Sequence, residues 1–170
     1  MKYRIDEAKS KIEFKATAPF HKFKGWSEKG FEGEIDIDFK NNIINDIEVI
    51  IKTEFFETGD KLKNHEMQKY IKSNKIPNAS FKLSEFKKMI KLEVYPDAES
   101  YEIIVIGVLS FMNIERELEL NIKASKTEDR LYADVYFDWS FKNYKLKPPH
   151  ILFIKLKDIV NISAYLEFLK

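Results

Sequence analysis

The sequence contains no cysteine, which excludes several kinds of chemistry at once. Without a thiol there is no disulfide, no thiolate metal site, no iron–sulfur cluster and no cysteine nucleophile. Histidine is scarce as well. His21, His65 and His150 are far apart in the sequence, and no pair has the spacing of a helical zinc site. We therefore predict no metal site.

An excess of charge of one sign is also missing. The 170 residues include 29 Lys plus Arg and 28 Asp plus Glu, which gives a formal net charge of +1. A duplex-binding surface usually carries a strong basic excess. The lysines here are interleaved with acids, as in KLKNHEMQK and KASKTEDR, a pattern typical of a hydrated surface. We therefore predict no nucleic-acid partner.

Long apolar runs are absent too. No stretch reaches the roughly 20 apolar residues of a membrane-spanning helix, and the longest candidate, residues 103–112, is interrupted by Gly107 and Ser110. The first ten residues, MKYRIDEAKS, lack the apolar core of an export signal. The sequence therefore predicts a cytoplasmic location, with the periplasm as the alternative if the chain is a processed form.

Motifs for catalysis are not found. The serines lie in contexts such as LSFMN and DWSFK, without a Gly-x-Ser-x-Gly elbow, and there is no glycine-rich phosphate loop. Glu34, Asp36 and Asp38 occupy alternate positions of one predicted strand, so we expect all three carboxylates on its outer, hydrated face. The sequence therefore predicts that the protein is not an enzyme. The alternative is an enzyme whose active site is an unsuspected one inside the fold.

What the chain does have is apolar residues at every second position. Hydrophobic residues make up 44% and aromatic residues 14% of the sequence, enough for a sizeable core. Alternation of this kind gives a strand one apolar and one polar face. The alternation runs through six segments: Ile12 to Ala16, Ile35 to Phe39, Ile47 to Ile51, Tyr101 to Leu109, Leu118 to Ala124 and Leu131 to Trp139. Residues 159–169 form a seventh segment, which is apolar over most of its length. Seven or eight antiparallel strands joined by short loops predict a sandwich or barrel in a single domain, residues 1–170.

One stretch, residues 58–73, breaks this pattern and favours a helix. Thr58 or Asp60 can act as its N-cap, and Pro77 marks the return to strand. Four apolar residues spread over about half of its circumference: Leu62, Met67, Tyr70 and Ile71. A second, short helical turn is predicted at residues 142–146, before two prolines impose an extended chain.

Four stretches, in order, resemble the YceI-like family of polyisoprenoid-binding proteins. They are YRIDEAKSKIEFKA with PFHKFKG and FEGEIDIDF; TGDKLKNHEMQKYI with IPNASFKL; YEIIVIGVLSFMNIERELEL; and SFKNYKLKPPHILFIKLKDIVNI. Together they extend from Tyr3 to about Leu169. Asn113 stands where the hairpin of the family usually has glycine, which is tolerable because Asn accepts the left-handed backbone conformation.

The resemblance implies a fold and a ligand. The implied fold is all-β: an elongated, eight-stranded antiparallel, lipocalin-like barrel with one covering α-helix. The implied function is the non-catalytic binding, carriage or storage of a long-chain polyisoprenoid, such as a polyprenyl quinone or polyprenyl phosphate, inside the barrel. A barrel of eight strands can hold one small ligand or be filled by its own side chains. The alternative is therefore a structural or interaction barrel with a filled core and no ligand.

The apolar residues supply a plausible lining for such a barrel, and no cofactor other than the lipid ligand is expected. The helix is predicted to control entry, and His21 is the candidate contact for a headgroup at the mouth. Lysines on the helix, Lys61, Lys63, Lys69 and Lys72, could favour a transient contact with a membrane surface, and a homodimer is left open. The predicted lining residues are Phe14, Phe20, Phe23, Trp26, Phe31, Met67, Tyr70, Ile71, Phe81, Val105, Leu109, Phe137 and Trp139.

Overall fold

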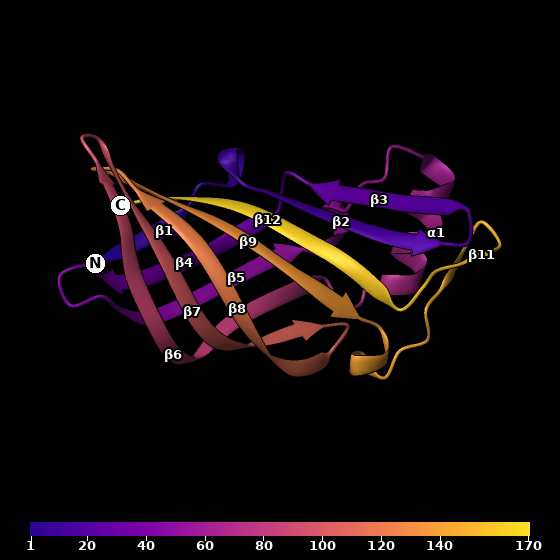
Figure 1. Cartoon of the computed structure of the whole chain (residues 1–170). Helices are drawn as coiled ribbons and strands as arrows, with labels where there is room; N and C mark the ends of the chain where they lie inside the picture. The colour runs from indigo at the N-terminus through magenta and orange to yellow at the C-terminus, as the bar shows by residue number, and fades with distance from the viewer.

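The chain forms an elongated barrel with both termini at one end and the single α-helix at the other (Figure 1). The computed structural model describes the whole backbone and the side chains of residues 1–92 and 96–170. The wall consists of nine long strands and one short one: β1 Lys2–Ile5, β2 Lys11–Ala18, β3 His21–Ser27, β4 Phe31–Asp38, β5 Ile43–Lys52, β6 Asn78–Tyr95, β7 Ala98–Phe111, β8 Ile114–Lys126, β9 Arg130–Ser140 and β12 Ile159–Leu169.

These ten segments form eight antiparallel strands of the wall, because β1 with β2, and β3 with β4, are each the two halves of one bent strand. The 3₁₀ turn η1 (Glu7–Lys9) separates β1 from β2, and a bend at Gly30 separates β3 from β4. The backbone N–H of Gly30 donates to the Glu7 carboxylate at 2.6 Å, so the two bends lie against each other. The order around the wall is β1/β2, β3/β4, β5, β6, β7, β8, β9 and β12, and β12 pairs with both β2 and β1 to close the barrel.

The wall is closed more tightly at the terminal end than at the helix end. β12 pairs with β9 along its whole length, whereas β8 pairs with β9 only over residues 122–126 of β8, next to the terminal end. β3 has no strand partner beyond β2 except a single bridge between Trp26 and Glu57. The strands therefore part toward the end at which the remaining elements lie.

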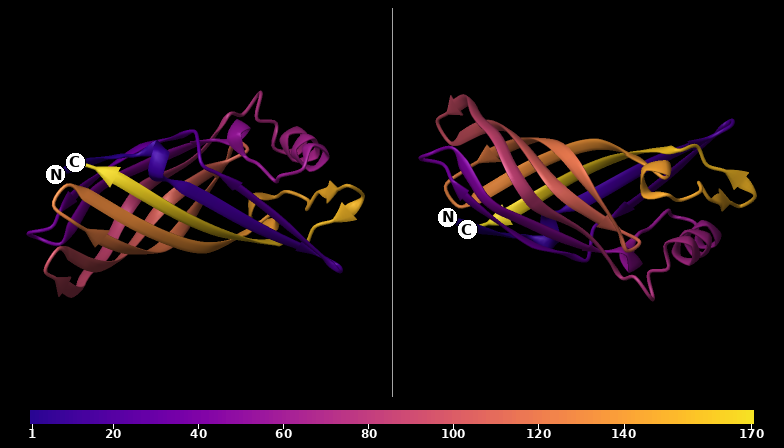
Figure 2. Two further views of the ribbon diagram at one scale, coloured as in Figure 1. Left: turned by 90° about the horizontal axis from the view of Figure 1, so that it is seen from above. Right: turned by 90° about the horizontal axis from the view of Figure 1, so that it is seen from below.

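Those remaining elements form two insertions that cover the helix end (Figure 2). The first follows β5 and contains η2 (Thr53–Phe55) and α1 (Lys61–Ile71). The second lies between β9 and β12, residues 141–158, and contains η3 (Lys142–Tyr144) and the small hairpin β10 (His150–Ile151) and β11 (Ile154–Lys155). Within the described part of the chain, no helix is long and apolar enough to cross a bilayer.

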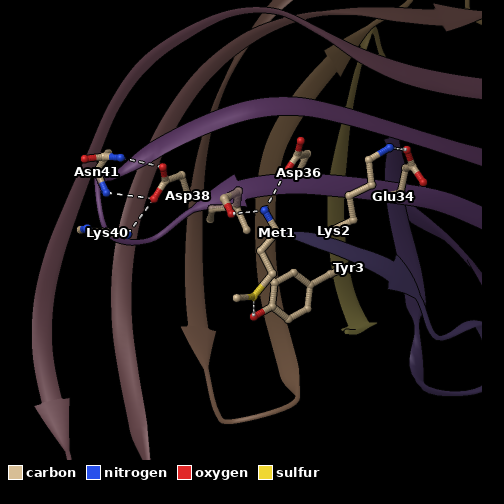
Figure 3. A network of polar contacts seen from close by, with 9 residues as sticks. Met1, Lys2, Tyr3, Glu34, Asp36, Asp38, Lys40 and Asn41 are labelled. Carbon is tan, nitrogen blue, oxygen red and sulfur yellow. Dashed lines mark hydrogen bonds and ion pairs between the residues drawn. The ribbon is translucent and has the colours of Figure 1, made fainter.

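The terminal end is held by polar contacts on the outside of the wall (Figure 3). The amino group of Met1 lies 2.9 Å from the Asp36 carboxylate, and Lys2 Nζ lies 3.0 Å from that of Glu34. Asp38 accepts hydrogen bonds from the side chain and backbone of Asn41. The three acids of this strand therefore lie on its outer face, as the alternation predicted, and their partners are structural.

The strands with regular alternation are predicted well, whereas elements that lack this alternation are predicted less well. The helix is confirmed but shorter than expected: it begins after Asp60, whose side chain accepts the N–H of Lys63 at 2.9 Å, and ends at Ile71. The predicted turn near residue 142 is the 3₁₀ turn η3. The strand expected after Pro77 is β6, but its length of 18 residues was not predicted, because register shifts at three bulges interrupt the period of two.

Candidate ligand-binding cavity

A cavity of about 240 Å³ runs through the inside of the barrel. Every strand from β4 to β9, together with β2, β3 and β12, contributes to its wall. On β9 the lining extends from Leu131 to Trp139, about 26 Å of strand and about 20 Å along the axis of a typically tilted barrel. The cavity is thus long and narrow rather than round.

The lining is almost entirely hydrocarbon. Among the residues that the structure describes, no carboxylate, imidazole or ammonium group lines the cavity, and the polar side chains in its wall are those of Ser80, Tyr70 and Trp139. An unpaired polar group of a ligand would lose its hydration in such a space without regaining hydrogen bonds. The cavity therefore suits a ligand segment that has no polar atoms.

Small residues keep the barrel hollow. Ala124, Ala133 and Ala164 lie on β8, β9 and β12 and all line the cavity. Ala124 and Ala133 are direct cross-strand partners, so two small side chains meet at one level of the wall. Larger side chains at these positions would fill the interior.

A glycine serves the same purpose by making room for an aromatic ring. Gly25 pairs with Phe14 across β2 and β3, and a Cβ atom added at Gly25 would lie 2.2 Å from the Phe14 ring. The Phe14 ring therefore lies against the β3 backbone and forms part of the cavity wall. It also packs on Phe56, with ring centroids 5.3 Å apart.

The two insertions form the wall at the helix end. Met67 and Ile71 of α1 line the cavity from one side, and Ile151 and Leu156 of the 141–158 segment from the other. Tyr70 joins the two insertions, because its hydroxyl donates to the backbone carbonyl of Lys147 at 2.8 Å. Burial raises the pKa of Tyr70, so the hydroxyl remains protonated as a donor at neutral pH.

The entry to α1 is held by a network around Glu57. One oxygen of the Glu57 carboxylate accepts hydrogen bonds from the Asn64 side chain at 2.6 Å and from the N–H groups of Gly59 and Thr58 at 2.7 and 2.9 Å. The Asn64 bond, followed by these N–H groups, holds the pKa of Glu57 below its ordinary value. Later in the helix, Gln68 Nε2 donates to the carbonyl of Thr53 at 3.0 Å. These bonds fix α1 to the end of β5.

The base of the 141–158 segment is held by Asp158. Its carboxylate accepts hydrogen bonds from the Ser140 hydroxyl at 2.6 Å and from the Lys142 N–H at 2.9 Å. Burial opposes ionisation of Asp158, but these bonds outweigh it and lower the pKa of the carboxyl group. Tyr144 packs behind, and its hydroxyl donates to the Leu109 carbonyl at 3.0 Å. Burial raises the pKa of Tyr144 to about 12.

The structure places nine of the thirteen predicted lining residues in the cavity wall. They come from five strands and the helix: Phe14, Phe23, Met67, Tyr70, Ile71, Phe81, Leu109, Phe137 and Trp139. Four others and the candidate headgroup contact lie elsewhere: Phe20, Trp26, Phe31, Val105 and His21.

Each of these corrections has a physical reason. Phe20 is fully exposed in the turn between β2 and β3, and the adjacent His21 is exposed as well, outside the cavity wall. Trp26 lies one position out of phase with the inward Phe23, so it faces outward and contacts the segment at Gly59. Phe31 and Val105 do point inward but are wholly enclosed by neighbouring side chains of the barrel core.

Sequence reasoning predicted the covering helix but missed the small residues, Phe56 and the covering role of residues 141–158. The alternation already placed Ala16, Ala124 and Ala133 on the inner face, so the signal was present, but only bulky side chains were considered as lining. The contributions of Phe56, Pro149, Ile151 and Leu156 follow from the folding of the two insertions over the mouth, which no local pattern indicates.

The family model described as the YceI-like domain matches residues 3–168. The chain belongs to the YceI-like domain family. No curated protein matches this sequence.

Solved structures share the fold of this YceI-like domain at low sequence identity. A polyisoprenoid binding domain from Saccharophagus degradans has a TM-score of 0.79 at 12% identity, with 98% of this chain and 97% of that chain covered. BcnA of Burkholderia cenocepacia has a TM-score of 0.75 at 17% identity, with 96% and 98% covered. The YCEI protein of Campylobacter jejuni has a TM-score of 0.65 at 15% identity, with 84% and 82% covered.

Proposed function

We propose that this YceI-like domain binds the tail of a polyisoprenoid lipid in its barrel, and that it carries or stores such a lipid without catalysing a reaction. The observation that carries the proposal is the long cavity of about 240 Å³ with its hydrocarbon lining. Membership of the family, and the polyisoprenoid binding named for the Saccharophagus degradans domain of the same fold, support this choice of ligand.

The shape of the cavity favours a tail over a compact ligand. Its length of about 20 Å, from the strand spacing and tilt of barrels, exceeds the roughly 15 Å of one leaflet of a bilayer core. A polyprenyl chain presents only hydrocarbon along such a length. Its quinone or phosphate headgroup requires water or polar partners, so it would remain at the mouth, near Tyr70 and Lys147 rather than at His21.

The same lining argues against a reaction inside the barrel. General acid–base and nucleophilic catalysis require titratable or nucleophilic groups positioned at the reacting atoms. Of the described side chains in the wall, only the Ser80 and Tyr70 hydroxyls could take such a part, and Tyr70 is committed to the Lys147 carbonyl. Binding is therefore the activity that this site supports best.

A barrel with a filled core is the competing function class, and extraction distinguishes the two. Protein purified without detergent is extracted with organic solvent and examined in parallel by native mass spectrometry. We expect a bound apolar molecule, or uptake of an added polyprenyl quinone with a stoichiometry of one. Recovery of no small molecule, together with no uptake of polyprenyl quinone or polyprenyl phosphate, would refute the proposal.

A further inference from the structure

Two phenylalanine side chains are almost wholly exposed at the helix end of the barrel. Phe20 in the β2–β3 turn is 105% exposed, and Phe153 in the β10–β11 turn is 99% exposed. Both turns project from the same end of the molecule in Figures 1 and 2. The N–H of Lys157 donates to the carbonyl of Thr17 at 2.7 Å, which joins the segments that carry the two turns.

The backbone at both tips is unfavourable for these residues. Phe20 has a φ of 61°, directly after Pro19, and Phe153 has a φ of 68°. Turns with positive φ favour Gly or Asn, and bulky side chains are rare there. Asn42 and Asn113 occupy such positions in two other turns, and Met112 and Leu152 also have a positive φ. The phenylalanines therefore strain the turns without any gain in core packing, which points to a contact outside the chain.

The two segments that carry these rings are rich in positive charge. Residues 19–24 and 141–158 contain seven lysines and one aspartate, a net charge of +6, whereas the whole chain has +1 and the remainder therefore −5. All seven lysines are exposed, and none forms an ion pair with a side chain that the structure describes. They are Lys22, Lys24, Lys142, Lys145, Lys147, Lys155 and Lys157.

We propose that this end of the barrel, the docking end, binds the surface of an anionic lipid bilayer. Phe20 and Phe153 enter the interfacial layer while the lysines face the lipid headgroups. The two rings stand on separate hairpins with charged residues around them, so they offer no continuous apolar face to a protein partner. A fluid bilayer interface accepts separate protrusions. The docking end also lies next to the cavity mouth, so the contact would bring that mouth to the membrane.

The contribution of the rings is tested by sedimentation with lipid vesicles. Wild-type protein is expected to bind vesicles that contain phosphatidylglycerol more tightly than pure phosphatidylcholine vesicles, and less tightly as salt is raised. Phe20→Asn and Phe153→Asn should each weaken binding about tenfold, since partial burial of a phenylalanine is lost. Asn suits the positive φ, so both variants should fold. Tyr136→Asn, which removes a 65% exposed ring from the wall, is the control and should bind like wild type.

The contribution of charge is tested with two triple variants of equal net charge. Lys→Gln substitution of Lys22, Lys155 and Lys157 should weaken binding about fivefold for each lysine removed. The same substitution of Lys82, Lys88 and Lys123, which are exposed elsewhere on the wall, should have little effect.

Three results would overturn the proposal. The first is equal binding to both kinds of vesicle, and the second is an equal loss of binding in both triple variants. The third is a dimer in light scattering that the double variant Phe20→Asn/Phe153→Asn abolishes, because this would assign the surface to a second copy of the chain. Uptake of a polyprenyl quinone in the absence of vesicles should not change in any of these variants. That measurement separates a failure here from a failure of the proposed function.

Discussion

Replacement of Ala164 by phenylalanine should close the cavity without unfolding the barrel. Ala164 lies on β12, is 8% exposed and lines the cavity. A cavity that holds one benzene ring measures about 150 Å³, so a phenylalanine ring would occupy more than half of the 240 Å³. Filling that volume is worth at most about 3–4 kcal/mol at about 24 cal/mol per Å³, and overpacking costs about 1–3 kcal/mol. The gain and the cost are of similar size, so the free energy of unfolding should change by no more than a few kcal/mol and the barrel should stay folded.

The same substitution should weaken binding of a polyprenyl quinone at least tenfold, because the tail loses most of the space that it would occupy. Binding is measured by titration of detergent-free protein, with the fluorescence of Trp139 in the cavity wall as the signal, and stability by urea unfolding of the ligand-free protein. Ala8→Phe, which adds the same ring at an exposed position of η1, is the matched control. Undiminished affinity in Ala164→Phe would refute the placement of the tail in this cavity.

Three further substitutions test the mouth and the wall. Tyr70→Phe removes the hydrogen bond to the Lys147 carbonyl, worth about 1 kcal/mol, and should accelerate release of the tail up to about fivefold in stopped-flow measurements. Glu57→Gln should reduce the free energy of unfolding at pH 7 and make it fall less steeply in acid. The reason is that a carboxyl group with a lowered folded-state pKa stabilises the fold above its ordinary pKa of 4.5. That contribution is lost as the pH falls through the folded-state pKa. Gly25→Ala should displace the Phe14 ring into the cavity and weaken tail binding in the same titration.

Each of these has a control within the chain. Tyr144→Phe also removes a hydroxyl that donates to a backbone carbonyl, but it should lower stability without faster release, since Tyr144 does not join the two insertions. A pH profile of Glu57→Gln parallel to that of wild type would contradict the role of the Glu57 network. For the wall, the double variant Gly25→Ala/Phe14→Leu should recover affinity, because the smaller side chain vacates the space. Persistent loss in that variant would indicate backbone distortion instead.

The inner face of the barrel could be predicted from the sequence to a large extent. The period of two in β9 placed Leu131, Ala133 and Val135 inside, and all three line the cavity. The predicted lining was wrong at Trp26, where the alternation was not applied. Trp26 is aromatic but has the opposite parity to Phe23, and its position in the alternation, rather than its hydrophobicity, decides that it lies outside.

The sequence by itself determined what depends on neighbours along the chain. It showed which side chains share a face, limited the helix N-cap to Thr58 or Asp60, of which Asp60 is the one observed, and indicated that Asn113 can adopt a left-handed turn, with a φ of 61°. The tertiary structure decided what depends on residues distant in sequence. Val105 is enclosed while Leu109, four residues later on the same strand, reaches the cavity, because packing volume varies along the barrel. Two insertions about 80 residues apart meet in the Tyr70–Lys147 hydrogen bond. No local periodicity encodes the distance between segments, so only the folded chain shows where the barrel is hollow and where it opens.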